Sequence, residues 1–246
     1  MKKIIAIIVM SVTVPLLLVA QDTLYVYGPG GPFAAVNECA QVFGKQNGIA
    51  VKVVAGPEGN WIDAAKENAD IVFGGAEYML TDFATKNKGI IDSSSRTELY
   101  KRAAAILVRP GNPKRILSLK DMARPGIKIL DVNGAGQLGM WEDLAGKQNV
   151  IKGIQQNIAG SFGNTALGIN AWKADKSYDA WITYASWYIR LKDITTLVKI
   201  PASQTVYRGT PVALTTISKH KQEALRFITF MQSEKGHVIF RKWGWE

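Results

Sequence analysis

The chain has 246 residues and a formal net charge of +10, with 47% hydrophobic residues, one cysteine and two histidines. This length is enough to bury hydrophobic cores without covalent cross-links, and a single cysteine excludes a disulfide bond within the chain. We expect Cys39 to be a small buried hydrophobic residue. The basic residues are scattered rather than clustered, which argues against nucleic acid as a partner and favours an ordinary solvated surface.

The first twenty residues are typical of a secretory signal peptide. Lys2 and Lys3 precede a nearly continuous apolar run from Ile4 to Ala20. Cleavage of residues 1–20 removes two lysines and no acid, so the formal charge falls from +10 to +8. The alternative is a retained membrane anchor, which the short run and Pro15 disfavour. We therefore expect a periplasmic or secreted protein.

Segments typical of strands and helices alternate along the rest of the chain. The expected strands are 23–27, 50–55, 70–74, 103–108, 127–132, 180–183 and 197–200. The expected helices are 33–43, 61–67, 78–87, one that begins at Ser118, 139–147 and 222–231. This alternation predicts an α/β fold with mainly parallel sheets, in which ligands bind beyond the carboxyl ends of the strands.

Four turns are rich in glycine and short polar residues; three follow an expected strand, and the fourth precedes a further helical stretch. They are residues 28–32, 55–61, 134–139 and 160–166. Glycine lets backbone N–H groups approach a ligand closely, and a helix N-terminus favours negative charge. Each turn alone is also consistent with a tight turn that binds nothing. Together they favour a ligand surrounded by neutral donors and helix ends.

The third turn, residues 134–139, matches the G-x-G-x-x-G pattern of dinucleotide-binding proteins. That function requires an acidic residue about twenty positions later to bind the ribose. The stretch Gly153-Ile154-Gln155-Gln156-Asn157 supplies none. The pattern therefore indicates a small anion at a helix N-terminus, or a plain helix start, and no nucleotide cofactor.

The sequence does not indicate an enzyme. A catalytic metal site needs three or four histidine, cysteine or carboxylate ligands, and the chain has only His220, His237 and Cys39 of the first two kinds. Neither histidine is near a glycine-flanked serine. The carboxylates Glu142 and Asp143 are adjacent, so on a helix they point apart.

Several short motifs along the chain occur together in one family. They are Leu24–Pro32, Gly56-Pro57 with Trp61, Ala69–Gly74, Arg102–Leu107 with Gly111–Pro113, Gly134–Gly136 with Trp141–Asp143, Asp179–Thr183, Val206–Arg208 and Phe240–Trp245. With these motifs the chain resembles type II periplasmic solute-binding proteins, and within them the accessory colonization factor C (AcfC)-like, adhesin-like antigen group, over essentially all of residues 23–246. The wider class includes molybdate- and sulfate-binding proteins.

The resemblance implies two α/β lobes around a cleft, with hinge crossovers near Ala103–Arg109 and Tyr207–Thr210. The first lobe would be residues 22–104 plus 208–246, and the second residues 105–207. The ligand implied is a small anion: an oxyanion such as sulfate or molybdate, or a small carboxylate or phospho-acid. Some relatives carry a Ser- and Thr-rich insertion after the turn at Gly134, which this chain lacks, so the ligand of those relatives does not transfer directly.

The resemblance also implies partners: an ABC permease or a host surface, and a second copy in a homodimer. The alternative function is an adhesin that binds host glycans or proteins through an outer face and has a role in colonization. An adhesin would keep its adhesion after the cleft is destroyed, whereas an anion-binding protein would lose its ligand.

The match and the chemistry of the side chains together give the candidate ligand-binding residues. They are Gly30, Gly31, Pro32, Asn60, Trp61, Ala135, Gly136, Gln137, Asn164, Thr165, Ala166, Trp181, Thr183 and Arg208. Arg208 is expected to supply the full positive charge, with an interlobe salt bridge as its alternative role. Arg102 is a weaker candidate for which we expect a structural role. Glu77 and Glu142 would repel an anion and are not expected in the site.

Overall fold

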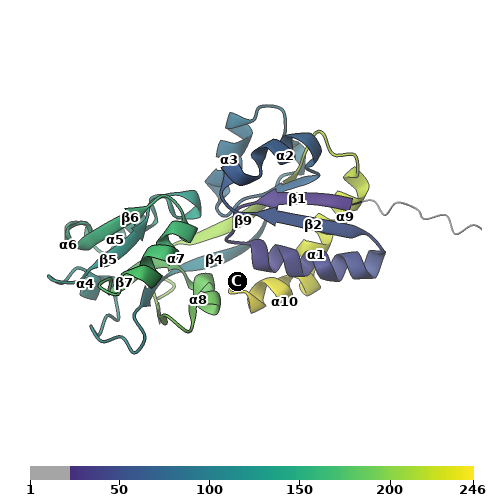
Figure 1. Ribbon diagram of the computed structural model, residues 1–246. Coiled ribbons are helices and arrows are strands. Elements are labelled where there is room, and N and C mark those ends of the chain that lie inside the picture. Colours follow the sequence, from purple (N-terminus) through teal and green to yellow (C-terminus); the bar gives the residue numbers. More distant parts are fainter. Residues whose placement is uncertain (1–22) are drawn as a thin grey trace, which may run out of the picture.

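The computed structural model describes residues 23–246 and shows an α/β protein with two lobes, each with its own strands and helices (Figure 1). The predicted two-lobed α/β fold class is confirmed. The predicted signal peptide lies outside the described residues. The strands are β1 (Thr23–Gly28), β2 (Ala50–Ala55), β3 (Ile71–Phe73), β4 (Thr97–Val108), β5 (Ile129–Val132), β6 (Ile158–Phe162), β7 (Ala180–Tyr184), β8 (Thr196–Lys199) and β9 (Tyr207–Leu214).

Ten α-helices surround the strands of the described chain. They are α1 (Phe33–Asn47), α2 (Ile62–Asn68), α3 (Glu77–Lys86), α4 (Leu119–Met122), α5 (Met140–Lys147), α6 (Ile151–Asn157), α7 (Thr165–Ala174), α8 (Ala185–Leu191), α9 (Lys221–Gln232) and α10 (Glu234–Lys242). Short 3-10 turns lie at Glu58–Asn60, Ser93–Ser95 and Ala135–Gln137. None of the helices between residues 23 and 246 has the length and apolar character needed to span a membrane.

Strand pairing shows where the chain passes from one lobe to the other. In the first lobe β1 pairs in parallel with β2 and β3, and in the second lobe β5 pairs in parallel with β6 and β7. The long strand β4 pairs with β9 as far as Ala103, with β7 from Ala104 onward and with β8 from Ala105 onward. In Figure 1, β4 and β9 run side by side between the lobes. The residue limits 104/105 and 207/208 stay a prediction.

Each lobe has its own hydrophobic core. The first-lobe core packs α1, α9 and α10 against the sheet through residues such as Phe43, Phe227 and Phe240. Cys39 on α1 is fully buried in this core, as the sequence predicts, and burial raises the pKa of its thiol to about 12. In the second-lobe core, Trp172 and Trp181 are fully buried and pack together. These cores hold the strand ends, and therefore the turns that follow them, in fixed positions.

Some elements were not expected from the sequence. Strand β4 begins at Thr97, six residues before the expected start. Its first five residues, which precede the buried part, are exposed or half-buried, so the sequence there does not have the apolar run of a buried strand. The strands β6 and β9 and the helices α6, α8 and α10 were also missed. Strand β6 carries Gly160 and Ser161, which do not favour a strand, and its pairing with β5 overrides that preference.

Candidate functional site

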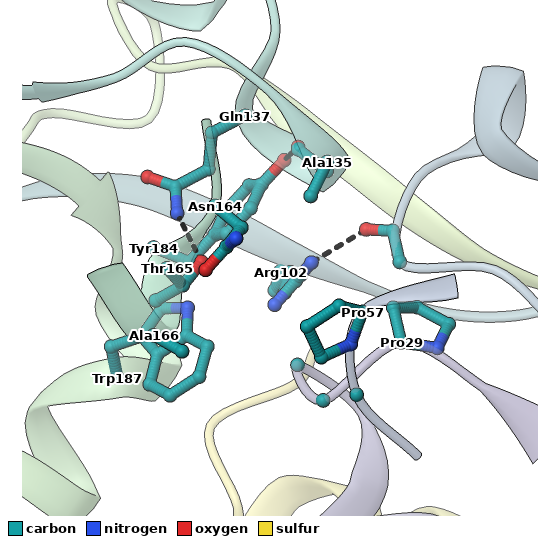
Figure 2. Close-up of a pocket in the computed structure, with 15 residues that line it drawn as sticks. Pro29, Pro57, Arg102, Ala135, Gln137, Asn164, Thr165, Ala166, Tyr184 and Trp187 are labelled. Carbon is teal, nitrogen blue, oxygen red and sulfur yellow. Dashed lines mark hydrogen bonds between the residues drawn. The ribbon is translucent and has the colours of Figure 1, made fainter. Parts of the chain in front are cut away.

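The glycine-rich turns of the two lobes meet around a small pocket of about 100 Å³. It is lined by Pro29, Gly30, Gly31, Gly56, Pro57, Gly75, Arg102, Ala135, Gly136, Gln137, Asn164, Thr165, Ala166, Tyr184 and Trp187. Figure 2 shows Arg102 in the middle, with Pro29 and Pro57 on one side and Gln137, Asn164 and Trp187 on the other. The volume is below the roughly 300–1,000 Å³ of pockets for drug-sized ligands, so it suits a small ion or acid.

The second-lobe wall consists of the turns that follow β5 and β6. These strands are parallel neighbours, so their carboxyl ends lie at the same edge of the sheet. The N–H of Asn133 donates to the carbonyl of Phe162 at 3.0 Å, which extends the ladder into the turns. A side chain at Gly134 would collide with the carbonyl oxygen of Gly163. Glycine at 134 therefore permits the close contact that brings the two turns together.

The turn Ala135–Gln137 is held by two tyrosines. Ala135 has a left-handed backbone (φ 48°), a conformation that costs energy for a residue other than glycine and is often found at functional sites. The Tyr78 hydroxyl on α3 donates to the Ala135 carbonyl and accepts from the Leu138 N–H at 3.0 Å. The Tyr184 hydroxyl donates to the Gly136 carbonyl. Both carbonyl oxygens, which would repel an anion, are thus bound by donors.

Polar side chains from the start of α7 complete this wall. The Asn164 side chain caps the helix by accepting from the Leu167 N–H at 3.0 Å. The Gln137 side-chain amide donates to the Thr165 hydroxyl at 2.8 Å, and its buried Oε1 atom has no partner (Figure 2). Rotation of that amide by half a turn would present its NH₂ group instead and let the Thr165 hydroxyl donate to Oε1.

Arg102 on β4 supplies a buried positive charge at the pocket. Only 2% of the residue is exposed, and its Nη2 atom donates to the Gly75 carbonyl at 2.5 Å. Its Nε and Nη1 atoms are buried with no hydrogen-bond partner. The guanidinium stacks on the Tyr184 ring at 3.7 Å and lies 5.3 Å from the Trp245 ring. Burial lowers the pKa of Arg102, because desolvation disfavours the charged form.

Three glycines from both lobes pack against the Arg102 guanidinium. A Cβ atom at Gly31 would lie 2.9 Å from Nη1, one at Gly136 would lie 3.1 Å from Nη2, and one at Gly75 would lie 3.3 Å from Nη2. Larger residues at these positions would push the guanidinium or the turns aside. The glycines of this site therefore let the backbone of both lobes lie close to the Arg102 guanidinium.

The structure brings most of the sequence-predicted site residues to this pocket. Those that line it are Gly30, Gly31, Ala135, Gly136, Gln137, Asn164, Thr165 and Ala166. Pro32 is the buried residue that precedes α1, and Asn60 is an exposed residue at the end of a 3-10 turn. Neither lines the pocket.

Three predicted aromatic and polar residues lie in the hydrophobic cores instead. Trp61 packs between Tyr27 and Phe83, and its indole N–H donates to the Gly56 carbonyl at 3.2 Å. Trp181 and Thr183 are fully buried on β7. Side chains alternate along a strand, so these two point away from the face that Tyr184 presents to the pocket.

Of the two arginines considered in the sequence, the structure places Arg102 and not Arg208 in the lining of this pocket. Arg208 lies outside the pocket and forms an ion pair with Asp143 on α5 at 2.7 Å, which was its alternative role. Glu77 and Glu142 do not line the pocket either; a Glu77 oxygen accepts from the Gly209 N–H at 2.6 Å. Arg102, for which a structural role was expected, is the cation that faces the pocket.

Other lining residues were not among the candidates. Pro29, Gly56 and Pro57 belong to turns already selected for their glycines, so the signal was present. Gly75 and Tyr184 follow the expected strands 70–74 and 180–183 by one residue. Trp187 lies on α8, a helix that the sequence did not indicate. Between residues 23 and 246, no group of three or more histidine, cysteine or acidic side chains is placed to hold a metal ion.

Comparison with known proteins defines the class to which this fold and site belong. Residues 24–246 match the model of the bacterial extracellular solute-binding protein family. The crystal structure of Peb3 from Campylobacter jejuni is 32% identical, with a TM-score of 0.83 and alignment over 91% of this chain and 99% of that one. The chain is therefore a member of this family of solute-binding proteins.

More distant structures share the fold. The sulfate-binding protein SubI from Mycobacterium tuberculosis is 17% identical with a TM-score of 0.78, covering 92% of this chain and 86% of that one. The periplasmic molybdate-binding protein of Azotobacter vinelandii is 16% identical with a TM-score of 0.69, covering 91% and 98%. No match is found among curated protein sequences. The predicted relation to type II periplasmic solute-binding proteins is confirmed.

Proposed function

We propose that this protein captures a small anion in the pocket between its two lobes. The observation that carries the proposal is the Arg102 guanidinium, which is buried at the pocket while its Nε and Nη1 atoms lack partners. A buried charge without partners is costly, and an anion that accepts from both atoms removes that cost. Charge-assisted bonds of this kind are roughly twice as strong as neutral ones.

The rest of the pocket is suited to oxygen atoms of an anion. The N-terminus of α7, a ten-residue helix, lies at the pocket with Asn164, Thr165 and Ala166. Its aligned peptide dipoles favour negative charge, and the Gln137 amide is close enough to join them. The carbonyl oxygens of Gly75 and Gly136 are each bound by a side-chain donor. Two carbonyl oxygens of the lining are thus already bound, and the lining supplies a cation and backbone donors for an anion.

Related proteins support an anionic ligand. A crystal structure of PEB3, 32% identical to this chain, contains L-phospholactate, and the structures of similar fold include proteins named for sulfate and molybdate binding. We therefore propose an oxyanion or a small phosphorylated or carboxylic acid as the ligand here. Exported from the cytoplasm, the protein would hold this ligand for delivery to an ABC permease.

Capture would involve closure of the lobes about a hinge in β4 and β9. The pocket takes residues from both of the proposed lobes, residues 22–104 plus 208–246 and residues 105–207. A ligand that contacts both sides binds the closed state more tightly and shifts the population toward it. The hinge lies where β4 changes its pairing from β9 to β7, at Ala103 and Ala104.

Isothermal titration calorimetry of the purified protein tests this proposal. The panel is sulfate, molybdate, phosphate, L-phospholactate and 3-phosphoglycerate, with lactate as a singly charged and glycerol as an uncharged counterpart, at physiological ionic strength. We expect saturable one-to-one binding of at least one multiply charged anion and none of glycerol. Absence of heat and of thermal stabilisation by every anion at millimolar concentration would overturn the proposal.

The adhesin interpretation, a role in colonization, a permease or host partner and a homodimer stay predictions. The anion-binding proposal does not depend on any of them, because the pocket is assembled within one chain.

A further inference from the structure

A second arginine, Arg190 on α8, reaches the wall of the pocket from the second lobe. Its Nη1 and Nη2 atoms donate to the carbonyl oxygens of Gly30 and Gly31 at 3.3 and 3.0 Å. Its guanidinium stacks on the ring of Trp187 at 3.9 Å. Gly30, Gly31 and Trp187 all line the pocket. Arg190 therefore contacts three residues that line the pocket, although it is not itself a lining residue.

Gly31 is placed between the two guanidinium groups. Arg102 Nη1 would be 2.9 Å from a Cβ at Gly31, while Arg190 Nη2 bonds to the carbonyl of the same residue. Like charges repel, and both guanidinium groups lie against the same residue, Gly31. Desolvation first, and then the charge of Arg102, lowers the pKa of Arg190 to about 10, so both groups remain positive near neutral pH.

Neither guanidinium has a carboxylate within salt-bridge distance among residues 23–246, whereas several other arginines do. Arg208 pairs with Asp143, Arg241 with Glu234 and Arg96 with Glu98. The charge of Glu77 raises the pKa of Arg102 without direct contact, and the Glu77 carboxylate accepts a hydrogen bond from the Gly209 N–H. The pocket therefore holds an excess of positive charge that the protein does not neutralise by direct contact.

We propose that Arg190 is a specificity-determining residue that makes the pocket prefer anions with two or more negative charges over anions with one. This inference rests on the proposed function. Arg190 acts through its charge at the pocket wall, so its contribution to binding scales with the charge of the ligand. A dianion gains about twice the stabilisation that a monoanion of the same shape gains, and the fold effect on its affinity is about the square of the monoanion's.

Sulfate and perchlorate provide the test, because both are tetrahedral oxyanions of similar size and differ in charge. Their affinities are measured by calorimetry, with perchlorate also as a competitor of sulfate, for wild type, Arg190→Gln and Arg190→Lys. Arg208→Gln is the matched control, since it removes an arginine that is already paired with Asp143. Circular dichroism and thermal melting check that each variant folds.

We expect Arg190→Gln to weaken sulfate about tenfold and perchlorate about threefold, and Arg190→Lys to recover most of the sulfate affinity. Arg208→Gln should change neither anion by more than about twofold. If Arg190 only tied α8 to the turn at Gly30, Arg190→Gln would weaken both anions by the same factor, and that result would overturn the inference. Equal weakness of the lysine and glutamine variants, or no loss in Arg190→Gln, would also overturn it.

The outcomes separate this inference from the proposed function. A wild-type protein that binds L-phospholactate but neither sulfate nor perchlorate keeps the proposed function and overturns the inference as tested. A wild-type protein that binds no anion of any kind overturns both. Where perchlorate does not compete with sulfate in the wild type, only the sulfate affinities of the variants are compared. Recovery in Arg190→Lys of the affinity lost in Arg190→Gln supports the inference, and no recovery overturns it.

Discussion

Replacing Arg102 by methionine should weaken anion binding by orders of magnitude while leaving the unliganded fold largely intact. Methionine keeps much of the side-chain volume in the space against Tyr184 but removes the charge and both unpartnered nitrogens. A hydrogen bond to a charged group contributes about 1.5–3 kcal/mol, so losing two costs about 3–6 kcal/mol of binding free energy. That corresponds to a decrease in affinity of roughly two to four orders of magnitude.

The effect of Arg102→Met on stability separates a binding role from a structural one. Removing the arginine loses its bond to Gly75 and its stacking on Tyr184, each about 1–3 kcal/mol. It also relieves the cost of burying two unpaired donors, about 1–3 kcal/mol each. These contributions largely cancel, so the unliganded protein should melt within about 5 °C of wild type.

The assay combines calorimetry against the tightest-binding anion with thermal melting, and Arg208→Met serves as the control. The control removes a partly exposed ion pair outside the pocket and should bind the anion with nearly wild-type affinity. The reasoning is refuted if Arg102→Met binds normally. It is also refuted if the unliganded variant loses the about 3–5 kcal/mol expected when one partner of a buried ion pair is removed.

Two further variants test the contacts between the lobes. Gly136→Ala places a methyl group 2.9 Å from the Gly75 carbonyl oxygen across the pocket, so it should weaken anion binding at least tenfold in calorimetry, whereas Gly163→Ala, with open space around its Cβ, should not. Removal from water raises the pKa of Tyr78 from 10.0 to about 12, so its neutral phenol contributes stability that is fully present below pH 10 and is lost as pH rises through 12. Tyr78→Phe should therefore show a shallower loss of stability in denaturant titrations between pH 10 and 12, and an unchanged slope would contradict this account.

Local patterns predicted the α/β class and the turns that line the candidate pocket, and the family resemblance added the two lobes. Alternating strand and helix segments indicate an α/β protein, and the glycine-rich turns after β1, β5 and β6 do line the pocket. The turns after β5 and β6 lie at one edge of a parallel sheet, so their proximity follows from the strand pairing, whereas the turn after β1 meets them from the other lobe. The neutral residues of the candidate site were thus predictable from these turns together with the family resemblance.

The arginine that lines the pocket could not be predicted from the sequence in the same way. Arg102 and Arg208 are direct partners in the ladder between β4 and β9, so the strand pattern gives no reason to prefer either. What distinguishes them is the position of Asp143, which lies on α5 in the other lobe and pairs with Arg208. A contact between residues 65 positions apart depends on tertiary packing that no local pattern records.

The most direct test of the account is a crystal structure of the protein with the anion that binds most tightly in calorimetry. The account predicts ligand oxygens about 2.7–2.9 Å from Arg102 Nε and Nη1, with the lobes closed and Arg208 still paired with Asp143. An anion bound elsewhere, or bound in the pocket with both Arg102 nitrogens still unpartnered, would contradict it.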